Sequence, residues 1–331
     1  MNKLRVGVVG VGKLGALHAK MYAQIPKAEL VGIIDSDADR ARDIASEFRT
    51  DVYSSLENLL RDVNVISIAT PTTTHYQIAM QAVDAGVHLF IEKPITHTLA
   101  EGEMLVRRAK EKGITVQVGH IERFNPAILA VETYNLQPMF IESHRLAQFN
   151  PRGTDVAVVL DLMIHDIDII LSLVKSPVRM IEADGVAVVS DTVDIANARL
   201  KFENGCVANV TASRISQKKM RKMRLFQKDA YISIDFLDGK AEVFRLVDSD
   251  QASDRRTKLL GRIEDGSKHR NITYERPKVR EVNPLRYELE LFLDAVESRK
   301  PPVVSGDDGL RALHVAQQIL ETIERQSVRM V

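Results

Sequence analysis

Near its start the chain carries a glycine pattern that few folds can use. The stretch Gly10-Val11-Gly12-Lys13-Leu14-Gly15 follows an apolar run, 4–9, and opens an amphipathic stretch, 13–24. Glycines between a strand and a helix allow a tight turn, a close backbone approach to a phosphate, and close packing of helix on strand. The pattern predicts a doubly wound α/β fold that binds a dinucleotide pyrophosphate at a helix N-terminus. The alternative is a glycine-rich turn that binds nothing.

A carboxylate downstream supports the dinucleotide interpretation. Asp35 lies 20 residues beyond Gly15, at the end of the next predicted strand. There it can accept hydrogen bonds from the ribose hydroxyls of adenosine, and its charge would repel a 2′-phosphate. NAD is therefore favoured over NADP as the cofactor. Ser36 and Arg40 belong to the same predicted cofactor site and could soften this exclusion, although Arg40 could equally stack on adenine or be a solvated helix residue.

The first part of the chain alternates short β-branched runs with longer amphipathic stretches. Strands are expected at 4–9, 29–34, 64–69, 88–91 and 114–118, and helices at 13–24, 37–48, 74–85 and 99–112. Continuous apolar strands separated by helices indicate a parallel sheet that helices cover on both faces. We therefore expect an NAD-binding Rossmann domain over residues 1–121.

Beyond this point the pattern changes. A long helix, 155–174, precedes a series of strand-like runs, at 178–188, 194–202, 206–213, 223–227, 231–236 and 241–246. Turn signals at Asn204-Gly205 and Asp238-Gly239 predict antiparallel pairing. The polar stretch 248–268 is expected to be a mobile loop, and helices at 284–298 and 307–326 close the chain.

This second part predicts an α+β domain over residues 122–331 with an open, mainly antiparallel sheet. An open sheet of this size leaves one face to be covered. A homodimer or homotetramer that forms through this C-terminal sheet would cover it, and we expect such an assembly.

Composition narrows the class of protein. Hydrophobic residues make up 45 % of 331 residues, which is enough for more than one core. Lys plus Arg and Asp plus Glu each number 45, and this balance argues against nucleic acid or an anionic membrane as a partner. Cys206 is the only cysteine, which excludes an intrachain disulfide and fits a reducing compartment. With no signal-peptide pattern and no apolar stretch free of charges, the sequence predicts a soluble, cytoplasmic protein.

Two more of the predicted strands end in distinctive residues. Thr70-Pro71 with His75 follows the strand at 64–69, and Glu92-Lys93-Pro94 follows the strand at 88–91. Ligands of an open parallel sheet bind beyond the carboxyl ends of its strands, so both loops are expected at the cofactor. Burial could lower the pKa of Lys93 so that it exchanges a proton near neutrality beside the nicotinamide. A simple ion pair of Lys93 with Glu92 is the alternative.

The long predicted helix of the second part carries an aspartate and a histidine one helical turn apart. Asp161 and His165 are four residues apart and Asp168 follows three later, so a regular helix would present all three on one face. This spacing suits a proton-transfer pair, although a buried histidine satisfied by its neighbours would look the same. A metal site needs more ligands than the sequence offers nearby, so no metal is predicted.

Taken together, these residues resemble the Gfo/Idh/MocA family of oxidoreductases. The shared positions are Gly10–Gly15, Thr70-Pro71 with His75, Glu92-Lys93-Pro94, Arg123-Phe124-Asn125-Pro126, Asp161 with His165, and the helix start at Gly306–Leu310. The resemblance covers essentially the whole chain and implies an NAD-dependent dehydrogenase of a sugar hydroxyl. It implies that Lys93 and His165 flank the reacting carbon, that Asp161 lies nearby, and that Pro94 follows a cis bond.

One difference from the family pattern indicates a subgroup of the family. Many members carry glycines just before the long helix and between its Asp and His, where this chain has 155–158 and Met163. Three segments, 119–126, 144–155 and 194–200, are similar to dehydrogenases that oxidise C3 of UDP-N-acetylglucosamine on the route to a diamino-sugar lipid A. The resemblance therefore implies a small-molecule substrate, a sugar or a sugar nucleotide.

A sugar nucleotide also needs cations for its diphosphate. The candidate substrate-binding residues are Arg123, Asn125, Arg145 and Arg152. The basic run Lys218–Arg224 is a second candidate, with a solvated strand edge as its alternative interpretation.

Two other functions stay open at this point. One is oxidation of a free polyol or sugar such as an inositol, which would not need the arginines. The other is a non-catalytic redox sensor that binds NAD only as a ligand. Lys93, Asp161 and His165 argue against the sensor, because a sensor needs no proton-transfer set.

Overall fold

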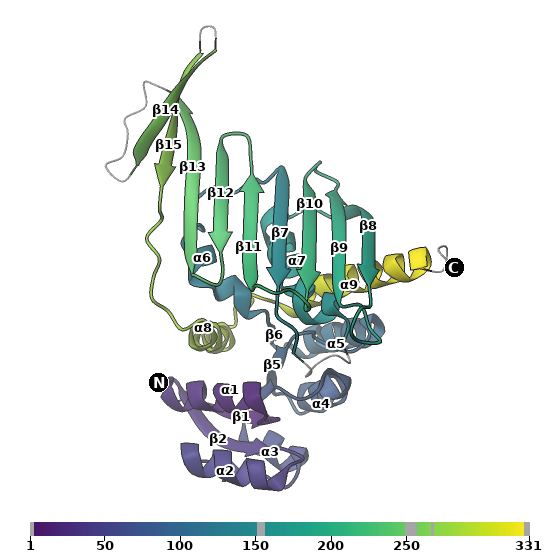
Figure 1. Cartoon of the computed structure of the whole chain (residues 1–331). Helices are drawn as coiled ribbons and strands as arrows, with labels where there is room; N and C mark the ends of the chain where they lie inside the picture. The colour runs from purple at the N-terminus through teal and green to yellow at the C-terminus, as the bar shows by residue number, and fades with distance from the viewer. Residues whose placement is uncertain (1–2, 151–155, 249–256, 266–267, 328–331) are drawn as a thin grey trace. The chain divides into compact units, whose positions relative to one another are not determined.

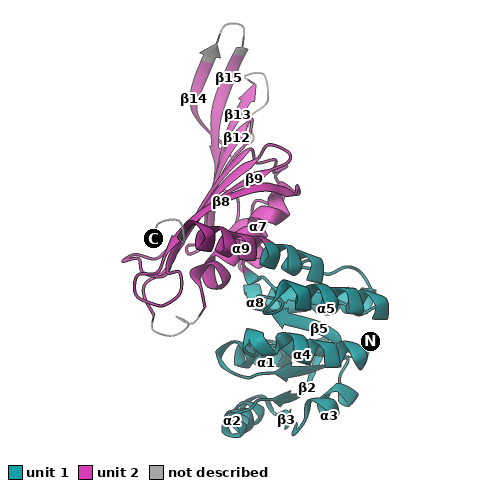
Figure 2. Cartoon of the chain, turned by 90° about the vertical axis from the view of Figure 1, so that its right-hand side faces the viewer, with its two compact units in different colours: residues 1–121, 282–314 teal, residues 122–281, 315–331 magenta. Residues whose placement is uncertain are grey.

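The structure is a computed structural model that describes residues 3–150, 156–248, 257–265 and 268–327. The chain forms two compact units, coloured teal and magenta in Figure 2. Residues 1–121 and 282–314 form the first unit, and residues 122–281 and 315–331 form the second. Helix α9 (Gly306–Ser327) begins in the first unit and ends in the second. Among the described helices, none combines the length and the apolar character that crossing a bilayer requires.

A parallel sheet of six strands forms the centre of the first unit, in the order β3-β2-β1-β4-β5-β6. Its strands are β1 (Leu4–Val9), β2 (Ala28–Ile34), β3 (Asp51–Val52), β4 (Val65–Ile68), β5 (His88–Glu92) and β6 (Val116–Gly119). The order reverses between β1 and β4, which are adjacent and parallel. Crevices at such a reversal are where doubly wound sheets bind ligands, outside the carboxyl ends of their strands. The predicted Rossmann sheet is confirmed.

The helices that connect these strands are α1 (Lys13–Gln24), α2 (Ala38–Phe48), α3 (Leu56–Asp62), α4 (Thr72–Asp84) and α5 (Leu99–Lys112). Helix α8 (Pro284–Ser298) belongs to the same unit. Helix α5 begins in a capping box formed by Thr98 and Glu101, and its C-cap is Gly113, whose φ is 67°. The short elements β3 and α3 were not predicted, because two and seven residues give too little periodicity to detect.

Helix α8 completes the core of the first unit although it lies far along the chain. Leu289, Phe292 and Leu293 are fully buried in the same cluster as Val6, Val8 and Phe90 of the parallel sheet. The rings of Phe292 and Phe90 meet edge to face, with centroids 5.7 Å apart. Asn283 caps the helix by accepting a hydrogen bond from the amide of Arg286 at 3.0 Å.

A nine-stranded sheet dominates the second unit, in the order β14-β15-β13-β12-β11-β7-β10-β9-β8. Its strands are β7 (Phe140–Leu146), β8 (Val178–Val186), β9 (Ile195–Phe202), β10 (Val207–Ser213), β11 (Met220–Phe226), β12 (Ala230–Asp235), β13 (Lys240–Asp248), β14 (Lys258–Asp265) and β15 (Lys268–Glu275). Strands β7 and β10 pair in parallel, and the other neighbouring pairs are antiparallel. The expected open, mainly antiparallel sheet is confirmed.

Three strands of this sheet, β7, β14 and β15, were not predicted. The polar stretch 248–268 was predicted to be a loop, but 258–265 is strand β14, paired with β15. Its residues 249–256 and 266–267 lie outside the described part. Strand β7 was missed because its buried positions include Ser143 and Arg145, so it lacks the apolar alternation by which strands are found.

Short helical segments accompany this sheet: η1 (Ile121–Phe124), α6 (Pro126–Leu129), η2 (Val159–Met163) and α7 (Ile164–Val174). Helix α6 contacts β12 and β13, whereas α7 contacts β7 and β10 (Figure 1). Along β7 buried residues alternate with half-buried ones, as expected when one face of a sheet is covered more fully than the other. Ring contacts form an aromatic row across β7, β11, β12, β13 and β15, made of Phe140, Phe226, Tyr231, Phe244 and Tyr274.

The position of α8 in the core generates a stability prediction. Phe292→Ala should lower the free energy of unfolding by about 3–5 kcal/mol, because it leaves a cavity between α8 and the parallel sheet. Urea unfolding followed by circular dichroism measures this. Leu237→Ala, at an exposed position of the second unit, is the control and should change it by less than about 0.5 kcal/mol. Equal effects of the two substitutions would contradict the placement of α8.

Candidate functional site

The glycine loop joins β1 to α1 at the carboxyl edge of the parallel sheet. Gly10 has a φ of 83°, and a Cβ on Gly15 would lie 1.7 Å from the Gly10 carbonyl oxygen. Helix and loop therefore approach so closely that only glycine fits at both positions. A Cβ on Gly12 would meet no protein atom within 4 Å, so the space in front of the helix is open there.

The N-terminus of α1 suits an anion. Gly12 is its N-cap, no side chain caps it, and its first turn holds no acidic residue. Lys13 and Leu14, the first two helical residues, are exposed. Free amide donors and the positive helix end attract phosphate, and Gly12 leaves room for it. The residues present therefore fit the pyrophosphate of a dinucleotide.

Asp35 lies beside this loop, at the end of β2. Its carboxylate accepts hydrogen bonds from the amides of Val11 at 2.7 Å and Asp37 at 2.9 Å, and from Nη2 of Arg40 at 2.9 Å. Burial raises the pKa of Asp35, but the hydrogen bonds from Arg40 and the two amides outweigh it and hold the pKa below its usual range. Asp35 is therefore charged at neutral pH. Ser36 is exposed and its hydroxyl lies 3.4 Å from the same carboxylate.

The loops after β4 and β5 are joined by His75. Its ring nitrogens lie 3.0 Å from the carbonyl oxygens of Thr70 and Pro94, and burial lowers the pKa of this histidine. Pro71 is the N-cap of α4. The bond between Lys93 and Pro94 is cis, as the family resemblance implied.

Lys93 follows the last residue of β5 and is half-buried. Its backbone amide donates to Oε2 of Glu92 at 3.3 Å. Burial raises the pKa of Glu92, but a hydrogen bond from His18 and the charge of Lys93 hold it below its usual range. His18 was not predicted as a site residue. Its only signal was its position, one turn beyond Gly15 on the helix that the glycine loop opens.

In the second unit the segment that carries Asp161 differs from the predicted regular helix. Residues 159–163 form a π-helical turn, and the α-helix begins only at Ile164. A π turn is wider than an α turn, so the four-residue spacing from Asp161 to His165 does not place them as an α-helix would. Both side chains are half-buried. Such turns are frequent at functional sites.

Asp168 is not part of an Asp–His face but the partner of an arginine. Nε and Nη2 of Arg123 each donate to its carboxylate at 2.6 Å. Within the described chain, no three His, Cys, Asp or Glu side chains gather in a way that could hold a metal ion.

Arg145 forms the second ion pair of α7, and its side chain is 2 % exposed. Nε and Nη2 donate to Asp166 at 2.7 and 3.0 Å, and Nη1 donates to Glu122 at 2.8 Å. The same oxygen of Glu122 accepts from Arg221 at 3.1 Å. Arg145 therefore ties α7 to β7 and to η1 through two buried carboxylates. Glu122 and Asp166 were not predicted as members of this network.

The structure describes only some of the other residues that were predicted to bind the substrate. Asn125 caps α6 and donates to Glu122 at 3.2 Å and to the carbonyl oxygen of Phe236 at 3.1 Å. Arg152 lies outside the described residues. The basic run reaches strand β11, where Lys222 pairs with Asp235. Contacts of these residues with a substrate stay predictions.

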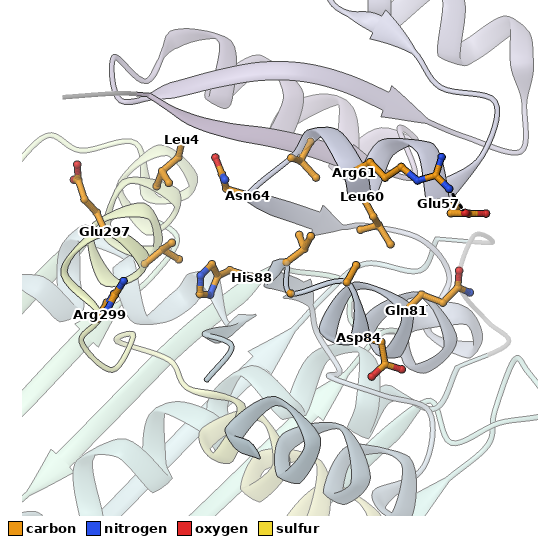
Figure 3. Close-up of a pocket in the computed structure, with 15 residues that line it drawn as sticks. Leu4, Glu57, Leu60, Arg61, Asn64, Gln81, Asp84, His88, Glu297 and Arg299 are labelled. Carbon is orange, nitrogen blue, oxygen red and sulfur yellow. Dashed lines mark hydrogen bonds and ion pairs between the residues drawn. The ribbon is translucent and has the colours of Figure 1, made fainter. Parts of the chain in front are cut away.

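A cavity of the first unit lies at the opposite, amino edge of the parallel sheet (Figure 3). Leu4, Asn64 and His88, at the starts of β1, β4 and β5, line it together with Arg61 and Arg299. Because ligands of doubly wound sheets bind beyond the carboxyl ends of the strands, this cavity is not the predicted cofactor site.

Comparison with known proteins agrees with this geometry. A family profile described as an oxidoreductase family with an NAD-binding Rossmann fold matches residues 4–120, and one described as the GFO/IDH/MocA C-terminal domain matches residues 127–233. UDP-N-acetylglucosamine 3-dehydrogenase of Acidithiobacillus ferrooxidans is 37 % identical over 325 residues, which cover 98 % of each chain. A solved structure of that enzyme has a TM-score of 0.87 at 36 % identity and covers 98 % of this chain and 99 % of its own. Myo-inositol 2-dehydrogenase of Thermotoga maritima is 26 % identical over 357 residues, covering 99 % of this chain and 98 % of its own.

The two glycines that flank the start of α1 should respond differently to alanine. In Gly12→Ala the added methyl group meets no protein atom, so the free energy of unfolding should stay within about 1 kcal/mol of the wild type. NADH binding should weaken roughly tenfold or more, because the methyl group occupies the pyrophosphate position. Gly15→Ala should cost about 2 kcal/mol or more because of its clash with the Gly10 carbonyl. Thermal unfolding and NADH titration by calorimetry separate the two. Unchanged NADH affinity in Gly12→Ala would contradict the cofactor site.

The Arg145 network predicts a large loss of stability in the second unit. Arg145→Met leaves Asp166 and Glu122 buried without their main cation, so the free energy of unfolding should fall by about 3–5 kcal/mol. Arg224→Met is the matched control, because Arg224 is half-exposed and its pair with Glu142 spans 3.4 Å. The control should lose about 1 kcal/mol or less in the same denaturant titration. A loss of similar size in both variants would show that the buried network is not specially stabilising.

Proposed function

This chain belongs to the Gfo/Idh/MocA family of oxidoreductases, and from that premise we propose that it oxidises a sugar hydroxyl to a ketone with NAD. The substrate proposed is a UDP-N-acetylhexosamine and the position oxidised is C3. The observation that carries this choice is the similarity, over nearly the full length of both chains, to UDP-N-acetylglucosamine 3-dehydrogenase.

The cofactor proposed is NAD in preference to NADP. Asp35 supports this choice, because a charged carboxylate at the end of β2 accepts the ribose hydroxyls of NAD and repels a 2′-phosphate. Gly10, Gly12 and Gly15 would bring the backbone to the pyrophosphate, and the loops at Thr70 and Glu92 would complete the site. The bound nicotinamide supplies the hydride acceptor.

Lys93 is proposed as the general base that takes the proton of the substrate hydroxyl. His165 is the alternative base, and Asp161 orients the proton-transfer pair. General base catalysis of this kind contributes about 10²- to 10⁴-fold. The half-buried position of Lys93 directly after β5, at the carboxyl edge of the sheet where the cofactor is proposed to bind, supports its assignment.

The predicted arginines divide into two roles in this proposal. Arg123 and Arg145 are bound to carboxylates of α7, so they would act by holding the helix that carries His165. Arg152 is then the proposed cation for the substrate diphosphate. Neutral polyols need no such cation.

A homodimer or homotetramer is also proposed, formed through the nine-stranded sheet. The aromatic row supports it, because its ring centroids lie 4.9 to 6.0 Å apart across five strands of one face. Aromatic residues are enriched where proteins associate.

Oxidation of a free polyol is the second candidate function. The similarity to a myo-inositol 2-dehydrogenase over nearly the whole chain supports it, at lower identity. A panel of UDP-sugars and polyols, assayed with NAD and with NADP at 340 nm, distinguishes the candidates. We expect NADH formation with a UDP-N-acetylhexosamine; activity on polyols alone favours the second function, and inactivity on all of them would restore the redox-sensor hypothesis.

A substitution at Lys93 tests the catalytic assignment. Lys93→Met should leave NADH binding intact and lower kcat about 10²- to 10⁴-fold, because the side chain keeps its length but can no longer accept a proton. Steady-state kinetics and NADH titration measure the two quantities. Turnover at the wild-type rate would refute the assignment.

A further inference from the structure

A chain of buried polar side chains runs through the first unit behind Lys93. Nε2 of His18 lies 2.9 Å from Oε1 of Glu92, and Nδ1 lies 2.8 Å from Oγ of Ser67. The hydroxyl of Tyr22 lies 3.4 Å from the same Oγ. His18, Ser67 and Tyr22 are fully buried, and they join α1 to the ends of β4 and β5.

The chemistry of the Glu92 carboxylate fixes the direction of its hydrogen bond with His18. An ionised carboxylate only accepts, so Nε2 of His18 carries a proton and donates it to Glu92. The hydroxyl of Ser67 lies within hydrogen-bond distance of both Nδ1 of His18 and the Tyr22 hydroxyl. Burial raises the pKa of Tyr22, so its hydroxyl stays protonated. The hydrogen bond that bears on Glu92 is therefore the one that Nε2 of His18 donates.

The Glu92 carboxylate packs against Gly119 and accepts a hydrogen bond at each of its oxygens. A Cβ on Gly119, at the end of β6, would lie 3.0 Å from Oε2 of Glu92, so any larger residue would press on it. That oxygen accepts from the backbone amide of Lys93, while the other accepts from His18. Both carboxylate oxygens are thus engaged, one by α1 and one by the residue that follows β5.

Packing alone does not require a histidine at this position. One side of its ring lies edge to face against Phe90, at 5.3 Å between centroids. An apolar side chain of similar size would pack there without burying a polar ring, whose desolvation has to be offset by hydrogen bonds. The hydrogen bond to the Glu92 carboxylate accounts for a histidine at this position.

We propose that His18 is a positioning residue for the reaction: it fixes the Glu92 carboxylate, which holds the backbone amide of Lys93 and so sets the position from which Lys93 acts. This rests on the proposed role of Lys93. The same helix then serves two purposes, because its N-terminus faces the pyrophosphate and its buried side positions the base.

Two amide substitutions test this with nearly matched chemistry. Glutamine places its amide nitrogen near the position of Nε2 and can still donate to Glu92, whereas asparagine reaches only as far as Nδ1. His18→Asn should lower kcat roughly ten- to a hundredfold, the size of one lost hydrogen bond to a charged group, with KM and NADH affinity within about threefold. His18→Gln should restore most of the lost kcat.

A second readout does not depend on the substrate. Backbone hydrogen exchange of Glu92 and Lys93, measured on the free protein, should be faster in His18→Asn than in the wild type and nearly unchanged in His18→Gln. Equal kcat or equal exchange in the two variants would overturn the positioning role, as would a loss confined to NADH affinity. If the wild type oxidises no sugar nucleotide, the proposed function fails, and hydrogen exchange still tests the role of His18.

Discussion

The close approach of α1 to the glycine loop is the constraint on which the first unit depends. The Gly10 carbonyl lies where a Cβ of Gly15 would be, so the helix starts directly against the end of β1. This placement leaves the helix N-terminus open at Gly12 and brings His18 to the ends of β4 and β5. The proposed phosphate site and the proposed support of Lys93 would thus both follow from one contact between backbones.

The second unit is organised by charge as well as by apolar packing. Helix α7 is apolar along most of its length, yet Asp166 and Asp168 are buried in it and each binds an arginine. Buried ion pairs stabilise little by themselves, but breaking one is costly because it leaves an unpaired charge. Such pairs define one position for α7 against β7 and η1, which a purely apolar contact would leave less strictly defined. A fixed position of α7 would also fix His165, which is proposed to take part in proton transfer.

Local signals explain which elements the sequence predicts well. Helix α5 was predicted with its observed ends, because Thr98 and Gly113 mark them within the chain itself. The glycine loop and Asp35 were placed for the same reason. His18 was missed because its partner Glu92 is 74 residues away, and no periodicity reports a contact of that kind. The partners of Arg145 could not be predicted, because a sequence shows the charge of a residue but not the carboxylates that surround it. The π turn before α7 leaves no sequence signal either.

Strand β14 has a consequence for how the protein behaves in concentrated solution. It is the outermost described strand on its side of the nine-stranded sheet, and Leu259, Leu260 and Ile263 on it are exposed. An outermost strand offers backbone donors and acceptors to any extended chain, and exposed apolar side chains add to that attraction. Charged neighbours such as Lys258 and Arg262 oppose it, since like charges repel when two such edges meet. The solubility of the protein is therefore set in part by the salt concentration, which screens the repulsion while leaving the apolar attraction in place.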